Sequence, residues 1–487
     1  MKPQRSIQFN FIMNAIFTAS SLLFPLITHP YVTRVLGPAG KGQAAFAYSV
    51  ISYFIMLTML GVPTYGIRAC AQVRDDREKL SRTVQELMIL NVGMSLVCYV
   101  LLAVCVALIG KFQEVKLLLW VTSSGILLNA IGVNWFYSAI EDYAYITVRS
   151  LVFKALSIVV MFLFVRSPEN VVWYCVVTVI ANYGSYVLNF FRLRKFITFR
   201  RFEHYSFLPH IKVALVFFAM SVATTVYTNL DVLMLRFMQD DAAVGYYDNA
   251  VKVKLILVSL VTSLGTVLLP RLSYYVKKGE KTEFIKVLDK ALRFVVYISV
   301  PLTAFFILCA RETVLVLAGR AFLPSVASMR IIMPTVLLIG ITNILGIQVL
   351  VPTGQEKKVT LSVTAGGVVD LILNAVLIPK LGAAGAALGT LAAELAVLII
   401  QLYMTRDILR ELPAMSFWRI LLGTAAAALA AAAVQRYAAI PWMLVRLAAE
   451  AAAFGAVYLG ASLLTREPML CEEILPRAEK LLRRGRT

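Results

Sequence analysis

A lysine in the middle of an apolar stretch is the residue of this sequence best suited to binding a charged ligand. Lys154 lies near the centre of residues 144–165, and no Asp or Glu stands three or four positions away to pair with it along a helix. Arg149 has no such neighbour either. A charge at the centre of a membrane helix costs about 2.5–3.5 kcal/mol on insertion scales, so a polar cavity or a carboxylate from another helix must compensate it. Both residues are therefore candidates for binding an anionic group.

Two carboxylates stand at comparable positions farther along the chain. Asp370 lies near the middle of residues 358–378 and Glu394 near the middle of residues 383–404, and a short turn joins these stretches as antiparallel neighbours. The carboxylates can form an ion pair with Lys154 across a cavity, carry a proton or a sodium ion, or be held by structural hydrogen bonds. The sequence leaves these three alternatives open.

Other charges in apolar stretches have local partners. Arg446 and Glu450 are four residues apart, and so are Asp248 and Lys252, so each couple is predicted to form an ion pair on one helix face. Lys254 lies roughly 200° farther round the helix and cannot easily share the carboxylate of Asp248. The predicted role of Asp248 and Lys252 is divided evenly between structure and ligand binding.

The motifs of covalent chemistry are missing from the sequence. There is no nucleotide-binding P-loop, and the three histidines and six cysteines are too scattered for a metal site or a catalytic triad. Asp75 and Asp76 lie between Arg74 and Arg77, which predicts local ion pairs rather than a metal-phosphate site. We therefore predict no enzyme, no metal and no cofactor, apart from H⁺ or Na⁺ as a coupling ion.

The whole chain has the composition of a membrane protein. Of its 487 residues, 60% are hydrophobic and 15% are charged, whereas soluble domains have about 45–50% apolar and about 25% charged residues. A spanning helix needs about 20 mostly apolar residues. Fourteen segments qualify, namely residues 9–35, 43–67, 84–109, 116–137, 144–165, 170–191, 210–237, 245–269, 291–310, 325–350, 358–378, 383–404, 416–435 and 441–463. We predict an all-α polytopic membrane protein with about fourteen transmembrane helices.

The net charge of +20 indicates orientation in a membrane rather than nucleic-acid binding. Lys and Arg gather in alternate connectors, with roughly three times as many on one side, and the positive-inside rule places both termini in the cytoplasm. The longest connectors, near residues 68–83, 192–209 and 270–290, are basic and contain aromatic or aliphatic residues. They are predicted to lie on the inner membrane surface.

A weak internal repeat divides the chain. Residues 34–42 and 236–245 each begin with Arg, end in Gly and join two predicted helices. Arg34 and Arg236 either reach the outer interface or contact a substrate. With the basic segment between the repeats, this pattern predicts two six-helix lobes around a central cavity. The predicted parts are residues 1–191 (first lobe), 192–209 (linker), 210–405 (second lobe), 406–465 (two further helices) and 466–487 (basic cytoplasmic tail). The nearly continuous alanines 425–433 suit close helix packing or a lipid-facing groove.

Short motifs occur in a specific order along residues 6–405. They are Pro30–Gly37 followed by Gly40–Gly42, Gly61–Arg68, Arg74–Lys79, Asp231, Val244–Tyr247 followed by Lys252, Gly319–Phe322, and Leu381–Ala387 leading to Glu394. This ordered set resembles the bacterial polysaccharide flippases of O-antigen and capsule type, within the multidrug/oligosaccharidyl-lipid/polysaccharide exporter superfamily. His29 and Lys41 depart from the pattern of the first hairpin, where an aromatic residue and a tyrosine are expected.

The resemblance implies translocation of an undecaprenyl-diphosphate-linked oligosaccharide between the leaflets of a bacterial plasma membrane, by alternating access and without a covalent step. It also implies that four of the candidate residues, Arg34, Arg68, Asp231 and Lys252, stand at recurrent positions. The full predicted substrate-binding set of the cavity is Lys154, Arg149, Arg34, Arg68, Lys252, Lys254 and Asp231, with Asp370 and Glu394 as candidates for ion coupling. Expected partners are the anionic lipid-linked glycan, membrane lipids, and glycan polymerases or glycosyltransferases, but not nucleic acid.

Two related functions stay open at this point. A flippase for the peptidoglycan lipid precursor would share these features, and so would a drug/cation antiporter, although an antiporter favours a carboxylate-rich cavity and Lys154 opposes that. A membrane glycosyltransferase or polymerase normally has a long outside loop, which this sequence lacks. A scaffold without transport activity would leave the charges within the helices unexplained.

Overall fold

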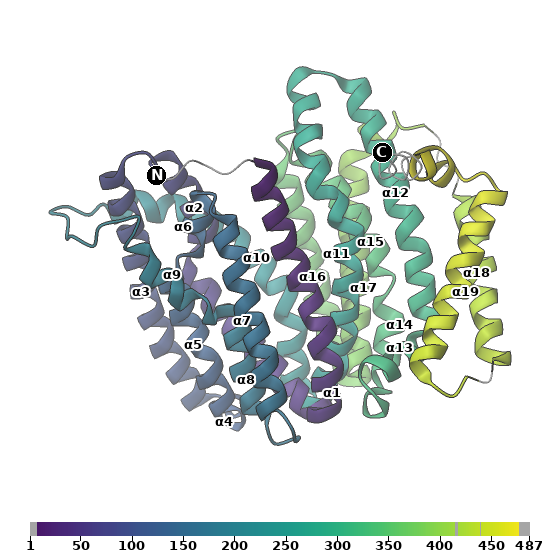
Figure 1. Ribbon diagram of the computed structural model, residues 1–487, viewed down its shortest axis with the longest axis horizontal. Helices are drawn as coiled ribbons and strands as arrows, with labels where there is room; N and C mark the ends of the chain where they lie inside the picture. Colours follow the sequence, from purple (N-terminus) through teal and green to yellow (C-terminus); the bar gives the residue numbers. More distant parts are fainter. Residues whose placement is uncertain (1–6, 414–416, 439, 477–487) are drawn as a thin grey trace, which may run out of the picture. The chain divides into compact units, whose positions relative to one another are not determined.

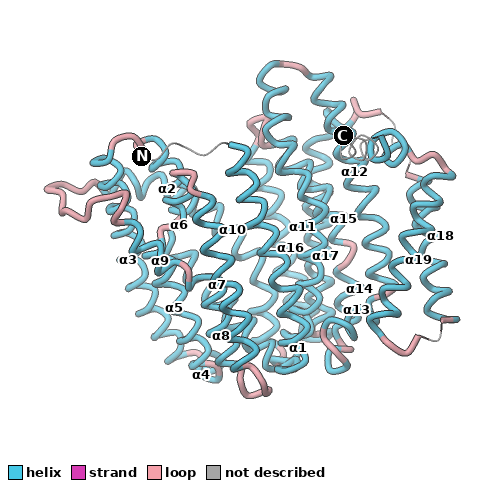
Figure 2. Tube along the Cα trace, in the orientation of Figure 1, coloured by secondary structure: helices cyan, strands magenta, loops and turns pink. Residues whose placement is uncertain are grey.

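The computed structural model describes residues 7–413, 417–438 and 440–476 (Figure 1). Within these ranges every regular element is a helix and no strand occurs (Figure 2). The chain packs as two compact units, residues 1–245 (the first unit) and residues 246–487 (the second unit), which are described separately below. The prediction of an all-α fold is confirmed.

The described part of the first unit contains ten α-helices and the start of an eleventh. They are α1 (Ile7–Met59), α2 (Val62–Gln72), α3 (Arg77–Leu108), α4 (Gly110–Glu114), α5 (Lys116–Gly132), α6 (Asn134–Ala139), α7 (Tyr143–Phe164), α8 (Val171–Val179), α9 (Tyr186–Leu193), α10 (Phe207–Met238) and the beginning of α11 (Asp241–Lys278). A π-helical turn, Ile180–Gly184, joins α8 to α9.

The second unit continues from α11. Its further helices are α12 (Lys281–Leu308), α13 (Ala310–Leu317), α14 (Ser325–Ile332), α15 (Thr335–Asn343), α16 (Glu356–Leu381), α17 (Ala383–Leu409), α18 (Trp418–Tyr437) and α19 (Met443–Leu464). Short 3-10 and π-helical turns occupy Arg320–Phe322, Ile344–Leu350 and Met469–Ile474.

The first two predicted helices are separated by a break within α1. Gly37 has φ 66° and ψ −178°, and Pro38 follows it. A positive φ is accessible to glycine at little cost, and proline cannot continue the hydrogen-bond ladder of the preceding turn. The predicted turn at residues 34–42 therefore corresponds to a real interruption, although the helix resumes directly after it.

The helices are long and apolar enough for a multi-pass membrane protein. Eleven helices of the described residues meet the length and composition of a membrane span, or up to twelve if the bent pair Asp241–Ser263 and Leu268–Lys278 counts as one. This count treats residues 12–72 as one 61-residue run, about 90 Å of helix against an apolar core of about 30 Å. It leaves out α5, which has 17 residues. The number fourteen stays a prediction.

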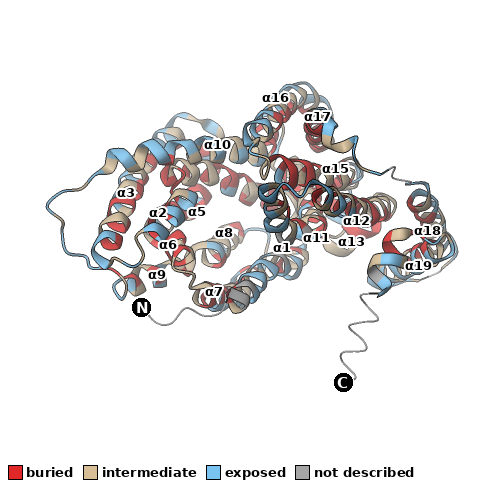
Figure 3. Cartoon of the chain, turned by 90° about the horizontal axis from the view of Figure 1, so that it is seen from above, coloured by how far each residue is buried: buried red, intermediate tan, exposed pale blue. Residues whose placement is uncertain are grey.

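Large apolar side chains are exposed on the helices, as contact with lipid requires. On α3, Leu96, Val97 and Val100 are 63%, 57% and 67% exposed. Figure 3 shows such exposed positions along the outward faces of the helices, with the buried residues turned inward. Large apolar side chains exposed on this scale suit a hydrocarbon solvent. The protein is a multi-pass membrane protein.

The predicted connector at residues 270–290 is largely helical. Within this connector, α11 continues to Lys278 and α12 begins at Lys281, with Gly279 at φ 72° between them (Figure 1). Hydropathy marks where the apolar surface ends, not where the helix ends. Ion pairs at helical spacing, such as Lys286 with Glu283 at 2.7 Å, stabilise the polar extension.

The connector between α2 and α3 is shorter than predicted because Asp76 begins a helix. Its carboxylate accepts hydrogen bonds from the backbone N–H groups of Glu78 and Lys79, both at 3.1 Å, as an N-cap does. Its ion-pair partner is Lys79, at 3.1 Å, and not Arg74 or Arg77. The backbone N–H and the ammonium of Lys79 lower the pKa of the Asp76 carboxyl.

The helix α10 packs within the first unit. The Ser49 hydroxyl on α1 donates to the Asn229 carbonyl on α10 at 3.1 Å, and Val232 and Leu233 pack on the core formed by α1, α3, α5 and α8. The lobes predicted at residues 1–191 and 210–405 stay a prediction, and so do the linker, the two further helices and the tail.

The predicted small-residue helix α18 packs closely in the second unit. Ala427 and Ala431 are fully buried in a cluster with residues of α12 and α19. In the same cluster the Tyr458 hydroxyl donates to the Tyr297 carbonyl at 2.8 Å. Of the two predicted uses of the alanine face, close helix packing is the one observed here.

Candidate functional site

The ammonium of Lys154 on α7 points at the first half of α1. Its Nζ lies 3.0 Å from Ser20 Oγ and 2.8 Å from Ser21 Oγ, and 5.4 Å from the centre of the Phe17 ring. Lys154 is half-buried, and among the residues that the structure describes it has no ion pair. Neutral hydroxyls and an aromatic face therefore hold this charge without cancelling it.

Arg149 lies on the same helix but in a closed polar cluster. Arg149 is 5% exposed, and its guanidinium donates to the side-chain oxygens of Asn189 and Asn134 and lies over the rings of Tyr145 and Tyr186 at 5.3 and 5.5 Å. Local sequence reasoning found no partner because the two amides come from α9 and α6. As a substrate-binding residue Arg149 stays a prediction, but its contacts here join α6, α7 and α9.

Arg236 is buried at the turn between α10 and α11. Its guanidinium lies 2.5 Å from Glu114 and 2.7 Å from Asp241, and Asp241 also accepts from the Gln43 amide at 3.0 Å. At 4% exposure Arg236 does not extend to the surface, as one of the predicted alternatives required. The carboxylate of Glu114, on the short helix α4, was not anticipated from the sequence.

The neighbouring candidates of this region differ in exposure. Arg34 is exposed on α1, one turn before the break at Gly37, whereas Asp231 on α10 is 5% exposed. The departures from the family pattern at His29 and Lys41 are both buried, and Lys41 Nζ donates to the Tyr174 hydroxyl at 2.8 Å. The lysine is thus accommodated by a tyrosine from α8.

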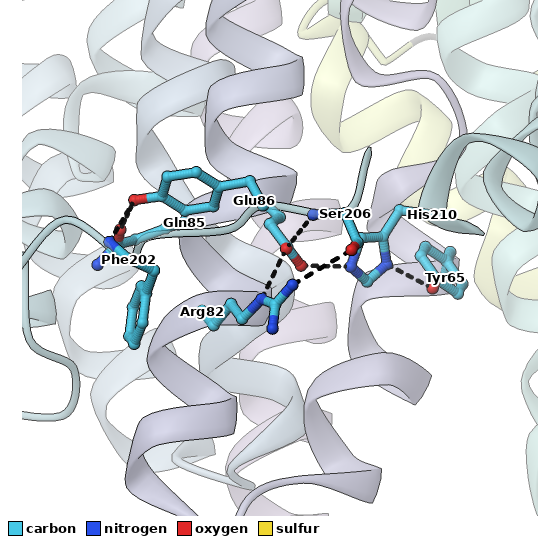
Figure 4. A network of polar contacts seen from close by, with 8 residues as sticks. Tyr65, Arg82, Gln85, Glu86, Phe202, Ser206 and His210 are labelled. Carbon is cyan, nitrogen blue, oxygen red and sulfur yellow. Dashed lines mark hydrogen bonds and ion pairs between the residues drawn. The ribbon is translucent and has the colours of Figure 1, made fainter. Parts of the chain in front are cut away.

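Near the start of α3, a buried carboxylate holds several segments together. Glu86 is 3% exposed and accepts from Arg82 Nε at 3.0 Å and from the Ser206 backbone N–H at 2.7 Å, while its second oxygen lies 2.7 Å from His210 Nε2 (Figure 4). The other ring nitrogen of His210 is 2.7 Å from the Tyr65 hydroxyl on α2. The network fixes the start of α10 to α2 and α3. Arg68, the predicted site residue on α2, is exposed.

In the second unit, the candidates on α11 separate into two groups. Lys252 Nζ lies 3.8 Å from Asp248, which confirms the predicted i,i+4 pair, although the distance is long. Lys254 is 9% exposed and has no ion pair within the described ranges. The side chains of Tyr247 and Asn249 reach Thr390 on α17 and Ser325 on α14, at 2.8 and 2.9 Å.

The carboxylates of α16 and α17 are buried in the helical hairpin. Asp370 is 2% exposed and Glu394 is 6% exposed. Asn374, one turn after Asp370, is fully buried. A Cβ on Gly389 would lie 2.2 Å from the Asn374 Oδ1 and 3.2 Å from the Asp370 Oδ1, so this glycine lets α17 approach both side chains. Asn374 was missed by the sequence analysis because amides carry no charge signal.

The remaining predictions concern structure rather than ligands. Arg446 Nε and Glu450 Oε1 are 3.1 Å apart, which confirms the predicted pair. All six cysteines are free thiols. Within the described ranges, no group of three or more His, Cys, Asp or Glu is arranged to hold a metal ion.

Comparison with known sequences identifies the family. The sequence profile of the polysaccharide biosynthesis protein family matches residues 8–276, more than half of the chain. The chain belongs to this family. A provisionally named O-antigen transporter of Escherichia coli strain K12 is 22% identical over 414 residues, covering 82% of this chain and 97% of that protein. A protein of the same name from Shigella dysenteriae is 22% identical over 396 residues, covering 81% and 98%.

Solved structures confirm the fold of this family member. The lipid II flippase MurJ in an inward closed conformation is similar with a TM-score of 0.73 and 15% identity, covering 94% of this chain and 99% of that one. An inward-facing multidrug resistance transporter of the MATE family gives a TM-score of 0.62 and 14% identity, covering 80% and 94%. At these identities the comparison establishes the transporter fold alone. The predicted resemblance to a bacterial polysaccharide family is confirmed by the sequence profile.

Proposed function

We propose that this member of the polysaccharide biosynthesis family is a flippase that carries an undecaprenyl-diphosphate-linked oligosaccharide from the inner to the outer leaflet of the bacterial plasma membrane. The translocation proceeds by alternating access and needs no covalent step. Family membership, the O-antigen transporter names of two relatives and the fold support transport of a glycan carrier. The surroundings of Lys154 are the observation that favours an anionic substrate.

The charge of Lys154 and its neutral surroundings favour an anionic substrate. Its ammonium has two serine hydroxyls as hydrogen-bond partners, at 2.8 and 3.0 Å, and both are neutral. A lysine kept within an apolar helix is costly unless its charge is used. A diphosphate supplies the missing negative charge and accepts charge-assisted hydrogen bonds from an ammonium. A cationic drug would be repelled at this position, so the antiporter alternative is disfavoured.

The other predicted substrate-binding residues complete the proposed path of the substrate. Arg34 and Arg68 are exposed on α1 and α2, where they can contact phosphate directly. Arg149, Lys252, Lys254 and Asp231 stay in the proposed set as residues that shape the charge of the cavity. With both termini in the cytoplasm, as the charge distribution predicts, the substrate enters from the side on which glycosyltransferases assemble it and leaves toward the glycan polymerase.

For the coupling ion we propose H⁺ or Na⁺ at Asp370 and Glu394. Both carboxylates are nearly inaccessible in the α16–α17 hairpin, and Asn374 lies beside Asp370 at the close approach of Gly389. Buried carboxylates within a membrane are costly, and ion pathways are the usual reason for them. Carboxylate and amide oxygens are also suitable ligands for a hard cation.

The test of the proposed function is complementation of a strain lacking the gene. Lys154→Ala should strongly reduce surface glycan at unchanged protein level and leave lipid-linked glycan inside, whereas Lys154→Arg should retain part of the activity. Lys116→Ala, which removes an exposed lysine at the start of α5, is the matched control and should behave as wild type. Normal glycan output from Lys154→Ala would contradict the role of Lys154. Rescue of a strain depleted of its peptidoglycan-precursor flippase would favour that alternative substrate.

A further inference from the structure

A groove lies at the end of the first unit where α3 begins and α9 ends. Its volume is about 530 Å³. The groove is lined by two arginines, three apolar side chains and a threonine, namely Arg77, Arg194, Phe190, Ile197, Phe199 and Thr198. Phe190 and Phe199 meet edge to face at 6.1 Å and form an aromatic wall. The groove thus combines two cations with an apolar surface.

Hydrogen bonds to α3 give the groove a defined shape. The Thr198 backbone N–H donates to Ser81 Oγ at 3.1 Å. The Gln85 amide donates to the carbonyls of Thr198 and Arg200, at 2.6 and 3.2 Å. Farther along the connector, the Tyr205 hydroxyl donates to the Gln85 side-chain oxygen at 2.7 Å. This non-helical segment is therefore tied to α3 at Thr198, Arg200 and Tyr205, and it projects from the first unit as a loop (Figure 2).

The two arginines of the groove have no acidic partner. Neither Arg77 nor Arg194 has an ion pair within the part of the chain that the structure describes, and both are exposed. Of the acidic residues beside Arg77 in the sequence, Asp76 pairs with Lys79 at 3.1 Å, and within the described residues neither Asp75 nor Glu78 forms an ion pair with Arg77 or Arg194. Two guanidinium groups are thus free to bind the same anion.

We propose that this groove binds the phosphate headgroup of an anionic phospholipid. The guanidinium groups of Arg77 and Arg194 would hold the phosphate, because Arg forms paired hydrogen bonds with phosphate oxygens. The glycerol and the first acyl carbons would lie on Phe190, Phe199 and Ile197. Free phosphate would leave this apolar wall unused, and for that reason we favour a lipid.

The surroundings of the groove fit the surface of a membrane. Phe191 and Phe199 are 59% and 43% exposed, and the exposed basic residues Lys195, Arg200 and Arg201 lie in the same connector. Aromatic side chains next to basic ones are typical of the interface, where rings enter the headgroup layer and cations meet anionic lipids. A bound lipid would hold the end of α9 to the start of α3. This inference is independent of the transported substrate.

The experiment measures lipid retained by the purified full-length protein. Wild type and variants in detergent are titrated with phosphatidylglycerol or phosphatidylcholine, and bound lipid is counted by native mass spectrometry. Wild type should bind phosphatidylglycerol more tightly than phosphatidylcholine. In the double variant Arg77→Gln/Arg194→Gln, phosphatidylglycerol binding should weaken about tenfold or more, since each change removes hydrogen bonds to a charged group. The double variant Lys357→Gln/Lys358→Gln removes two exposed lysines at the start of α16 and should bind as wild type.

Two further arms identify the ligand and control for folding. Inorganic phosphate at millimolar concentration should not displace the lipid, and Phe199→Ala should weaken lipid binding while the melting temperature stays at that of wild type. Displacement by inorganic phosphate would overturn the lipid assignment. Equal binding by the arginine and lysine double variants would overturn the site itself. If the arginine variant melts at a lower temperature, the single variant Arg194→Gln replaces it, and unchanged binding again contradicts the proposal.

Discussion

The carbonyl oxygen of Asp241 lies directly against Gly42. A Cβ on Gly42 would come within 1.7 Å of that oxygen, and a Cβ on Gly245 would come within 2.1 Å of the Pro38 carbonyl oxygen. The two turns that end in glycine, one in α1 and one at the start of α11, therefore pack backbone to backbone within the first unit. The internal repeat of the sequence marks a contact between its two copies.

Gly42→Ala should disrupt this contact and destabilise the protein. The obstructing atom belongs to the backbone, so it cannot move aside like the end of a flexible side chain. Overpacking of this kind costs about 1–3 kcal/mol or more. The variant should melt at a lower temperature in detergent and show reduced surface glycan in the complementation assay.

Gly93→Ala on α3 is the control for Gly42→Ala. No atom lies within 4 Å of its added Cβ, and alanine is favoured over glycine in a helix interior by about 1 kcal/mol. Its stability should equal or exceed that of wild type. If both variants melt alike, the close approach at Gly42 has no energetic consequence.

Hydropathy and motif order predicted the helical membrane fold and the family, because apolar length and local residue types carry both signals. The ends of helices were less predictable. The connector at residues 270–290 is mostly helix, since ion pairs such as Arg293 with Asp289 at 2.8 Å stabilise helix beyond the apolar region. The break at Gly37 was located because Gly-Pro is a local signal.

Contacts between distant segments were outside the reach of local reasoning. Arg446 and Glu450 were paired correctly because they are one helical turn apart. The partners of Lys154 are 133 and 134 residues away and are uncharged serines. Arg149 likewise depends on amides from two other helices. The sequence therefore indicates which charges need partners but not which residues supply them.

Glu86→Ala should loosen the connector between α9 and α10. The change leaves the Arg82 guanidinium, His210 and the Ser206 N–H without their shared acceptor, and bonds to a charged group contribute about 1.5–3 kcal/mol. Trypsin should cut faster after Arg200 and Arg201, which are exposed in the connector. Glu78→Ala, an exposed position on the same helix, should leave the cleavage rate unchanged. An unchanged rate in Glu86→Ala would show that other contacts hold the connector.

Asp370→Asn should uncouple transport from the ion gradient. The change keeps the shape of the side chain and removes the negative charge that a proton or sodium ion requires. In vesicles with reconstituted protein, the imposed H⁺ or Na⁺ gradient should no longer accelerate movement of a fluorescent lipid-linked glycan. Asp407→Asn, whose side chain is 81% exposed on α17, should respond as wild type. A gradient response that survives in Asp370→Asn would contradict the proposed coupling site.

The N-cap of α3 should depend on pH. The pKa of Asp76 is lowered in the folded protein, chiefly by the backbone N–H of Lys79. The stabilisation is therefore present above the pKa of Asp76 in the unfolded chain, near its ordinary value of 3.8, and is lost as pH falls through the lower pKa of the folded protein. Relative to Asp76→Asn, which caps without titrating, the first-turn amides of α3 should lose hydrogen-exchange protection only on acidification below about pH 4. Equal pH profiles in the two proteins would contradict this.

Replacing both Arg446 and Glu450 by apolar residues should destabilise the protein less than replacing Glu450 alone. Glu450 is fully buried and Arg446 is 26% exposed, with Nε and Oε1 3.1 Å apart. Glu450→Leu alone should cost about 3 kcal/mol, at the low end for a broken buried pair because Arg446 keeps some access to polar surroundings. The double variant Arg446→Leu/Glu450→Leu should recover most of that loss, since two apolar side chains need no compensation in a helix of the membrane. Melting temperatures in detergent give the comparison, with Arg436→Leu, an exposed position on α18, as the control. A double variant less stable than Glu450→Leu would show that Arg446 is held by its hydrogen bond to the Gln435 carbonyl, at 2.8 Å, more than by Glu450.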